Sequence, residues 1–298
     1  MGDTLEQYGK KIQRLKKLLR IKNKLGGFET ADSDRISRWA VDILNHMDLV
    51  IVPSTFAKNT IQNSGVVTPV EVLPHGIPDE FLNPNRIVTH PQLAELLDFK
   101  IKHKAIFILH HLPHSGYRKG SDLVYEVMKK VQEKYPNTYL IVKRLNVLDH
   151  MLGKLLSLRS FEIGEELSWK DYVNLYDICD ICLVPSRGGG FEVPAIEAIA
   201  RGVPTLVPDA GCFKDYIQYT VPITVNSYPE VLPENPIHIG RGFEVSLEDF
   251  YDKLTHVIEN LEDYKRKFGK YAKEVREKYA WGKICNRLVE ILRHYGFM

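Results

Sequence analysis

Residues Val184–Pro208, VPSRGGGFEVPAIEAIARGVPTLVP, carry the clearest structural pattern of the sequence. An apolar run over residues 181–184 leads into it, and three glycines follow at 188–190. The spacing predicts a helix over residues 195–200, ended by a glycine and a proline, and then a second apolar run over 205–207. Strand, glycine loop, helix and strand in this order are typical of an α/β protein with a parallel sheet.

This order of elements predicts a site for an anion with an adjoining sugar. Glycines let backbone N–H groups approach an anion without interference from a Cβ atom. The start of a helix adds N–H donors and the positive end of its dipole, and Pro194 suits that position through its fixed φ. Glu197 lies about one turn further on, where a carboxylate can accept hydrogen bonds from sugar hydroxyls. The residues favour a nucleotide site; the alternative is a tight turn in which glycines serve packing alone.

The same block resembles the signature of the family-four retaining glycosyltransferases, which have the two-lobed GT-B fold. That signature runs roughly PS-x-x-E-G-F-G-x-P-x-x-E-A. It is matched at Pro185-Ser186, Gly190-Phe191, Pro194 and Glu197-Ala198. The resemblance implies that Glu197 holds the ribose of a nucleoside-diphosphate sugar and that the Gly190 and Phe191 amides bind its diphosphate. Gly189 stands where the family has its first glutamate, a residue that contacts the donor sugar. Glu192 replaces the glycine after Phe191 and is counted with the donor-binding residues.

A second anion-binding arrangement is predicted just before the middle of the chain. An apolar strand over 104–109 precedes the turn HHLPHSGYRKG at 110–120, and a helix from Ser121 to Tyr135 follows. The turn resembles the R-K-G motif of the same family. The resemblance implies that Arg118 and Lys119 neutralise the donor diphosphate and that Ser115 or His114 contacts the donor. The alternative is a solvated turn. The resemblance also places the nucleotide base on the backbone of Glu165–Leu167.

Two groups of residues contain side chains that can bind metals, but their spacing and surroundings argue against a metal site. His110, His111 and His114 lack a carboxylate partner, and consecutive strand residues point to opposite faces. Cys179 and Cys182 have a metal-like spacing, but no second pair accompanies them, and an apolar surrounding predicts buried thiols. We therefore expect no metal.

Residues 1–84 predict a small lobe. A strand is expected over 48–52, a helix over 57–63 and a short strand over 70–74, with Asp32 or Ser33 capping another helix that runs through Leu44. This segment resembles the end of the family's first domain, with matches at Asp48, Pro53, Ser54, Gly65, Pro74, Gly76 and Asp79. A complete Rossmann half takes about 150 residues. We therefore expect a reduced lobe of about two strands, whose edges are covered by helices or by a second copy of the chain. The family's first-lobe catalytic histidine has no visible match.

Residues 4–25 predict an amphipathic helix with a basic face. Leu5, Tyr8, Ile12, Leu15 and Leu19 form its apolar stripe. One interpretation places this helix on an anionic membrane surface. The other packs the stripe on the body of the protein and leaves the cations in water.

The composition fits an ordinary globular protein. Its 298 residues are 44% hydrophobic and 26% charged, and the net charge of +2 gives no argument for nucleic-acid binding. Four scattered cysteines do not make a disulfide scaffold. No apolar run is long enough to span a membrane and no secretory leader is visible, so we expect a cytoplasmic protein, with peripheral membrane contact as the open alternative.

The sequence as a whole predicts an α/β protein of GT-B type with two Rossmann-like lobes. We expect a reduced N-terminal, acceptor-side lobe over 1–84, a complete nucleotide-sugar donor lobe over 85–280, and a C-terminal helix over 281–298 that crosses back to the first lobe. The resemblance implies a metal-independent glycosyltransferase that retains anomeric configuration and uses an unknown acceptor, either lipid-linked or a protein glycan. Two alternatives stay open: a non-catalytic nucleotide-sugar-binding protein or partner subunit, and another α/β nucleotide-handling enzyme such as a sugar-nucleotide epimerase.

Overall fold

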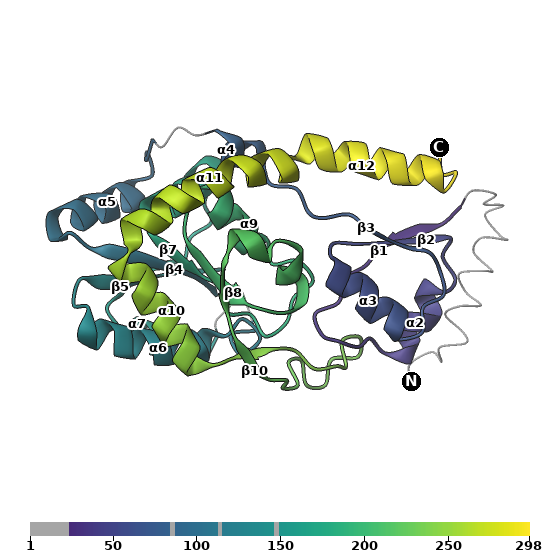
Figure 1. The fold of residues 1–298 in the computed structure, drawn as a ribbon, viewed down its shortest axis with the longest axis horizontal. Coiled ribbons are helices and arrows are strands. Elements are labelled where there is room, and N and C mark those ends of the chain that lie inside the picture. Colours follow the sequence, from purple (N-terminus) through teal and green to yellow (C-terminus); the bar gives the residue numbers. More distant parts are fainter. Residues whose placement is uncertain (1–23, 84–86, 113–114, 146–148) are drawn as a thin grey trace.

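Two parallel sheets organise the computed structural model, which describes residues 24–83, 87–112, 115–145 and 149–298 (Figure 1). The smaller sheet has the order β1-β2-β3, and all its pairings are parallel. Its strands are β1 (Gly26–Phe28), β2 (Leu49–Val52) and β3 (Val70–Val72). The expected α/β architecture is confirmed.

Strand β1 corrects the sequence prediction of two strands in the small lobe. Gly26 and Gly27 directly follow the helix predicted for residues 4–25 and were not assigned to a strand, whereas both pair in register with β2, at Leu49 and Val50. Glycine is depleted in strands and brings no side chain to pack, so local propensity conceals this strand. Pairing with a strand that is distant in the sequence is what fixes it.

Helices cover both faces of the small sheet. On one face lie α2 (Arg38–Leu44) and α3 (Thr55–Asn63), and on the other lies α12 (Trp281–His294). The expected cap of α2 at Asp32 or Ser33 is wrong, because the Ser37 hydroxyl accepts from the Ala40 amide. The Asp32 side chain instead accepts a hydrogen bond from the Gly190 amide in the glycine loop.

The larger sheet has the order β6-β5-β4-β7-β8-β9, again all parallel. Its strands are β4 (Ile106–Leu112), β5 (Thr138–Arg144), β6 (Ser160–Ile163), β7 (Ile181–Leu183), β8 (Thr205–Pro208) and β9 (Val221–Ile223). The chain runs outward from β4 to β6, returns to β7 beside β4, and then runs outward the other way. The strand order therefore reverses between β4 and β7, and ligands of open α/β sheets bind at the carboxyl ends of such neighbouring strands.

Helices connect these strands and flank the large sheet. They are α4 (Asp79–Leu82), α5 (Pro91–His103), α6 (Ser121–Lys134), α7 (Met151–Leu156), α8 (Trp169–Ile178), α9 (Val193–Ala200), α10 (Leu247–Glu259) and α11 (Leu261–Tyr279). Short elements complete the fold: η1 (Gly211–Asp215), η2 (Ile217–Tyr219), β10 (Val225–Ser227) and β11 (Glu244–Val245). Ile77 and Phe81 already belong to the larger core.

The two lobes touch on one side and are bridged on another. Backbone amides of Asp34 and Ser37 donate to the carbonyls of Arg241 and Ile237, at 2.8 Å each. Helices α11 and α12 run on from the large lobe across to the small sheet (Figure 1). No helix in the part of the chain that the structure describes is long and apolar enough to cross a membrane. The predicted basic helix of residues 4–25 falls outside that part, except for Lys24 and Leu25.

Candidate active site

The two predicted turns lie side by side at the point where the strand order reverses. One turn leaves the carboxyl end of β4 and the other leaves that of β7. The Arg187 amide donates to the Arg118 carbonyl at 2.7 Å, and the Arg118 guanidinium donates to the Gly188 carbonyl at 3.0 Å. The two turns can approach each other closely because Gly120 has no side chain. A Cβ at this position would lie 2.3 Å from the Pro185 carbonyl oxygen.

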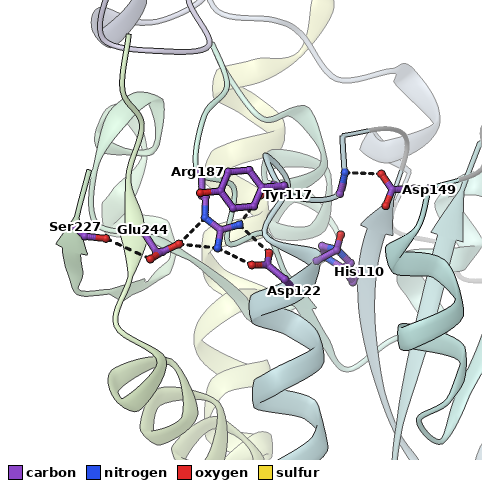
Figure 2. A network of polar contacts seen from close by, with 9 residues as sticks. His110, Tyr117, Asp122, Asp149, Arg187, Ser227 and Glu244 are labelled. Atoms are coloured by element: carbon purple, nitrogen blue, oxygen red, sulfur yellow. Dashed lines mark hydrogen bonds and ion pairs between the residues drawn. The ribbon is translucent and has the colours of Figure 1, made fainter. Parts of the chain in front are cut away.

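A buried arginine fastens the glycine loop to its neighbours, as Figure 2 shows. Arg187 is 1% exposed and forms a bidentate pair with Asp122 at 2.7 and 2.8 Å. Its guanidinium also binds Glu244 at 2.6 Å and lies 4.0 Å from the centre of the Tyr117 ring. The loop is thus tied to the start of α6 and to β11. Sequence reasoning missed this residue, because its acidic partners lie far from it in the sequence, one before it and one after it.

The side chain of Asp32 lies in the corner between the two turns, a place bounded by the Gly190 amide and the Arg118 guanidinium. Asp32, from the small lobe, accepts from the Gly190 amide at 3.1 Å, and its other oxygen lies 3.3 Å from the Arg118 guanidinium. A glycine is needed at 190, since a Cβ would lie 1.6 Å from the Thr30 hydroxyl. The corner therefore binds an anionic group with one backbone amide and one guanidinium, which is how a phosphate is bound. Nothing in the local sequence around Asp32 indicates this contact.

Lys119 and Glu192 form a buried ion pair next to this corner. The Lys119 ammonium lies 2.6 Å from the Glu192 carboxylate, whose side chain is 2% exposed. Phe191 precedes Glu192 in the loop. Its carbonyl accepts a hydrogen bond from the Tyr216 hydroxyl at 2.7 Å, which fixes the backbone there. Its ring packs edge-on against His75 from the small lobe.

A cavity of about 420 Å³ contains Glu197, and it shares His111 and Pro194 with a small cavity that Lys119 and Glu192 line. It is lined by His111, Lys143, Arg144, Leu145, Glu166, Leu167, Trp169, Tyr172, Val193, Pro194 and Glu197. Glu197 is 3% exposed and accepts from the hydroxyls of Tyr176 at 2.7 Å and Tyr172 at 3.1 Å. Burial raises the pKa of Glu197 to about 7, against the smaller opposing effect of the two tyrosine hydrogen bonds. The cavity has the size and the mix of aromatic and polar groups that suit a nucleoside.

Lys143 positions the loop on the far side of this cavity. Its ammonium donates to the carbonyls of Glu165 at 2.6 Å and Arg144 at 3.0 Å, and burial lowers its pKa. The Glu165 carboxylate faces away, toward His90 at 3.3 Å. Leu167 lines the cavity, whereas Glu165 does not and is connected to it only through the bond from its carbonyl to Lys143. Lys143 is a second residue that the sequence did not single out.

The remaining predicted residues lie around the turn after β4. Ser115 has a left-handed backbone, with φ of 55°, and its carbonyl accepts from the Lys119 amide at 3.0 Å. His110 is buried, and its ring nitrogens contact the Leu183 carbonyl and the Ser121 hydroxyl. Burial lowers the His110 pKa to about 4, so this ring is neutral. His114 lies outside the described residues. Within those residues, no three metal-binding side chains gather at one place.

A second cavity, of about 540 Å³, lies between the small sheet and α12. Its lining is mainly apolar: Phe28, Glu29, Thr30, Ile51, Val52, Pro53, Leu73, Pro74, His75, Trp281, Ile284, Cys285 and Leu288. His75 joins the two sites, because it lines this cavity and contacts Phe191 of the glycine loop. The site region therefore has a polar, cation-rich side on the large lobe and an apolar side on the small lobe.

A family model described as glycosyl transferases group 1 matches residues 98–275. A protein named putative glycosyltransferase 45, from Sulfolobus islandicus filamentous virus, is 30% identical over 275 residues, which cover 89% of this chain and 73% of the relative.

Solved structures are similar over most of the chain. A trehalose-6-phosphate synthase, OtsA, matches with a TM-score of 0.72 at 14% identity, covering 96% of this chain and 69% of that one. HepE from Anabaena, solved in complex with UDP and glucose, matches with a TM-score of 0.65 at 16% identity, covering 86% and 66%. The chain thus spans about two thirds of the length of these structures, and the likeness extends to both lobes.

Proposed function

Because this chain belongs to the glycosyl transferases group 1 family, we propose that it moves a sugar from a nucleoside diphosphate to an acceptor, with retention of configuration and without a metal. The observation that carries the proposal is that the glycine loop and helix α9 provide both the corner, where the Gly190 amide and the Arg118 guanidinium bind a carboxylate, and Glu197 in its cavity. One ligand that carries a pentose next to phosphates fits both.

The nucleoside would lie in the cavity of Glu197. Ribose hydroxyls would donate to the Glu197 carboxylate, and the base would rest on the backbone between Glu165 and Leu167, which Lys143 holds in place. Tyr172 and Tyr176 fix the carboxylate from the other side. A buried carboxylate with two tyrosine donors keeps acceptor capacity for a further hydroxyl.

The diphosphate would replace the Asp32 carboxylate at the corner. The Gly190 and Phe191 amides, the Arg118 guanidinium and the Lys119 ammonium would then surround it. As the sugar departs, negative charge grows on the β-phosphate, and groups already aimed at that charge lower the barrier. Preorganised donors therefore provide the leaving-group stabilisation, and no metal is assigned.

We propose that the small lobe is a reduced acceptor lobe and that its acceptor has an apolar part. The cavity of about 540 Å³ between the small sheet and α12 is mainly apolar, and His75 connects it to the glycine loop. A lipid-linked acceptor fits this lining better than a free sugar. Transfer to a polyprenyl-phosphate-linked sugar but not to the same sugar without the lipid would support this proposal, and equal transfer to both would contradict it.

Titration calorimetry with nucleoside diphosphates tests the donor site. Lys119→Ala and Glu197→Ala should each weaken binding about tenfold or more, since each removes a hydrogen bond to a charged group. Lys130→Ala, on the exposed side of α6, is the control and should bind like the wild type. Unchanged affinity in both site variants would overturn the assignment.

A non-catalytic nucleotide-sugar-binding protein is the second candidate, since Gly189 lacks the carboxylate of the family signature and the small lobe has three described strands. Slow release of free sugar from the donor without acceptor separates the two, because only an enzyme gives it. Retention is tested by the anomeric configuration of the product, and metal independence by activity in a chelator. Self-association through the small sheet, a cytoplasmic location and membrane contact by residues 4–25 stay predictions.

A further inference from the structure

The turn that carries Arg118 and Lys119 has a strained backbone. It is compact, because the Lys119 and Ser121 amides donate to the Ser115 and Gly116 carbonyls at 3.0 and 2.9 Å. Ser115 has a left-handed conformation, with φ of 55°, and only three other non-glycine residues in the described part of the chain have positive φ. A residue with a Cβ keeps such a conformation where its surroundings hold it there. The turn therefore needs support from outside itself.

Arg187 supports this turn from the side of the glycine loop. Its amide donates to the Arg118 carbonyl at 2.7 Å, and its guanidinium donates to the Tyr117 carbonyl at 2.5 Å. Both bonds act on the middle of the turn. They do not reach Gly116, the residue directly after the strained Ser115.

Asp149 supports the turn at Gly116. It lies in the loop between β5 and α7, and its side chain is 10% exposed. One carboxylate oxygen accepts from the Gly116 amide at 2.7 Å, and the other accepts from the Met151 amide at 2.9 Å. Figure 2 shows the first of these bonds. A carboxylate with so little exposure is costly unless bonds of this kind compensate for the lost water.

Gly116 and Asp149 fit each other closely. A Cβ added to Gly116 would lie 2.6 Å from Asp149 Oδ1 and 3.0 Å from Oδ2, so the carboxylate reaches this amide because the residue is glycine. A hydrogen bond to a charged group stabilises by an energy of the same order as the cost of a left-handed residue with a Cβ. The single bond from Gly116 to Asp149 can therefore offset the strain at Ser115.

The bond to Met151 orders only the loop before α7, whereas the bond to Gly116 bears on ligand binding. Arg118 and Lys119 follow Gly116 by two and three residues, so a shift of the backbone at Gly116 displaces both cations. We propose that Asp149 is a positioning residue for the donor diphosphate: it holds the turn where the Arg118 guanidinium and the Lys119 ammonium reach the phosphates. This inference rests on the proposed glycosyl donor, and Asp149 itself does not touch the ligand.

The test compares a nucleoside diphosphate with its nucleoside. The probes are UDP with uridine and GDP with guanosine, and the pair whose diphosphate binds the wild type is used. Calorimetry gives the affinity of the diphosphate, and displacement of the bound diphosphate gives that of the nucleoside. Asp149→Ala should weaken the diphosphate about tenfold or more, as for a lost hydrogen bond to a charged group, and change the nucleoside less than about threefold. An equal loss for both ligands, or no loss, would overturn the proposal.

Two further variants separate positioning from a general loss of structure. Asp149→Asn keeps one acceptor oxygen, so its diphosphate affinity should lie between those of the wild type and Asp149→Ala. An affinity as low as that of Asp149→Ala would contradict the role of the bond to Gly116. His150→Ala is the matched control, since its ring lies 3.6 Å from the Asp149 carboxylate but is 77% exposed, and it should bind both ligands like the wild type. If thermal unfolding shows that Asp149→Ala does not fold, the comparison of the two ligands is made on Asp149→Asn.

A double-mutant cycle shows whether Asp149 acts through the turn. Lys119→Ala removes one of the two cations that the turn places. In that background, Asp149→Ala should cost a factor in diphosphate affinity that is smaller by about threefold or more than in the wild type. Independent, multiplying losses would mean that the carboxylate does not act through this turn, and the proposal would fall.

Failure of this inference differs from failure of the proposed function. If neither nucleoside diphosphate binds the wild type, the donor site itself is wrong. If one binds and depends on Lys119 and Glu197, but Asp149→Ala has no effect specific to the diphosphate, only the present inference falls.

Discussion

At the scale of single residues, the proposed donor site depends most on Glu197. Its carboxyl is buried under Tyr172 and Tyr176, and burial raises its pKa to about 7. The group is therefore mostly protonated at pH 6 and mostly ionised at pH 8. Only the ionised form offers both oxygens to ribose hydroxyls as charged acceptors.

This pKa predicts that donor affinity rises with pH. Between pH 6 and pH 8 the ionised fraction of a group with a pKa of about 7 rises about tenfold, so a nucleotide sugar should bind up to about tenfold more tightly at pH 8. Calorimetry with the nucleotide sugar measures this, since its diphosphate does not titrate in that range. Glu197→Gln should give weak and pH-independent binding. A wild-type affinity that is flat, or that falls with pH, would contradict the role of Glu197.

Single residues were predictable where a local motif carries them. Arg118, Lys119 and Glu197 stand at fixed distances from glycine turns, so the sequence predicts one donor site for them, and the structure brings the two turns into contact. The contact of Asp32 could not be predicted, because it crosses between lobes to a loop far away in the sequence. The position of the Glu192 carboxylate also depends on a backbone conformation and on the space left by the missing side chain of Gly189.

At the scale of elements, the glycine loop depends on anchors outside itself. Arg187 ties it to Asp122 at the start of α6 and to Glu244 in β11 (Figure 2). Removing one partner of a buried pair leaves the other charges without compensation. The loop would then lose the register that sets Gly190 and Phe191 opposite Arg118.

Arg187→Ala is therefore expected to lower the free energy of unfolding by about 3 kcal/mol and to weaken donor binding as well. Lys134→Ala is the matched control, since it breaks an exposed pair with Glu259 and should cost less than about 1 kcal/mol. Urea unfolding measures both. Equal small effects in the two variants would show that the Arg187 network does not hold the loop.

The segment from Thr30 to Ser37 closes the corner from the side of the small lobe. Asp32 competes for the same donors as a bound diphosphate, and two like charges at short range repel. Asp32→Asn should therefore tighten nucleoside-diphosphate binding about 3- to 10-fold by calorimetry, as the repulsion is removed. Asp34→Asn, whose carboxylate accepts from the Arg241 amide instead, should leave affinity near that of the wild type. Weaker binding in Asp32→Asn would mean that Asp32 supports the ligand and does not compete with it.

Elements of the large lobe were predictable because their signals are local. Apolar strands alternate with amphipathic helices there, and Ser168 and Ser246 cap α8 and α10 as their sequences indicate. In the small lobe, β1 consists of two glycines and one exposed phenylalanine, and only its partner strand reveals it. The cap of α2 was misplaced for a similar reason: Asp32 and Ser33 have cap-forming side chains but are used for contacts with the other lobe.

At the scale of the whole molecule, the candidate site lies where two unequal lobes meet. The large lobe provides cations, amides and the Glu197 cavity at the carboxyl ends of β4 and β7. The small lobe provides Asp32, His75 and the apolar cavity under α12. The donor-binding side of this site was predicted from two sequence motifs, the glycine loop and the turn with Arg118 and Lys119. The sequence did not indicate an apolar pocket, since that surface comes from strands and a helix at opposite ends of the chain.

The most direct measurement is a crystal structure of the protein with the nucleoside diphosphate that binds it. We expect phosphate oxygens on the Gly190 amide and the Arg118 guanidinium, with Asp32 displaced and the ribose hydroxyls on Glu197. A diphosphate bound away from the corner between the β4 and β7 turns, or a ribose that does not reach Glu197, would contradict the proposed donor site.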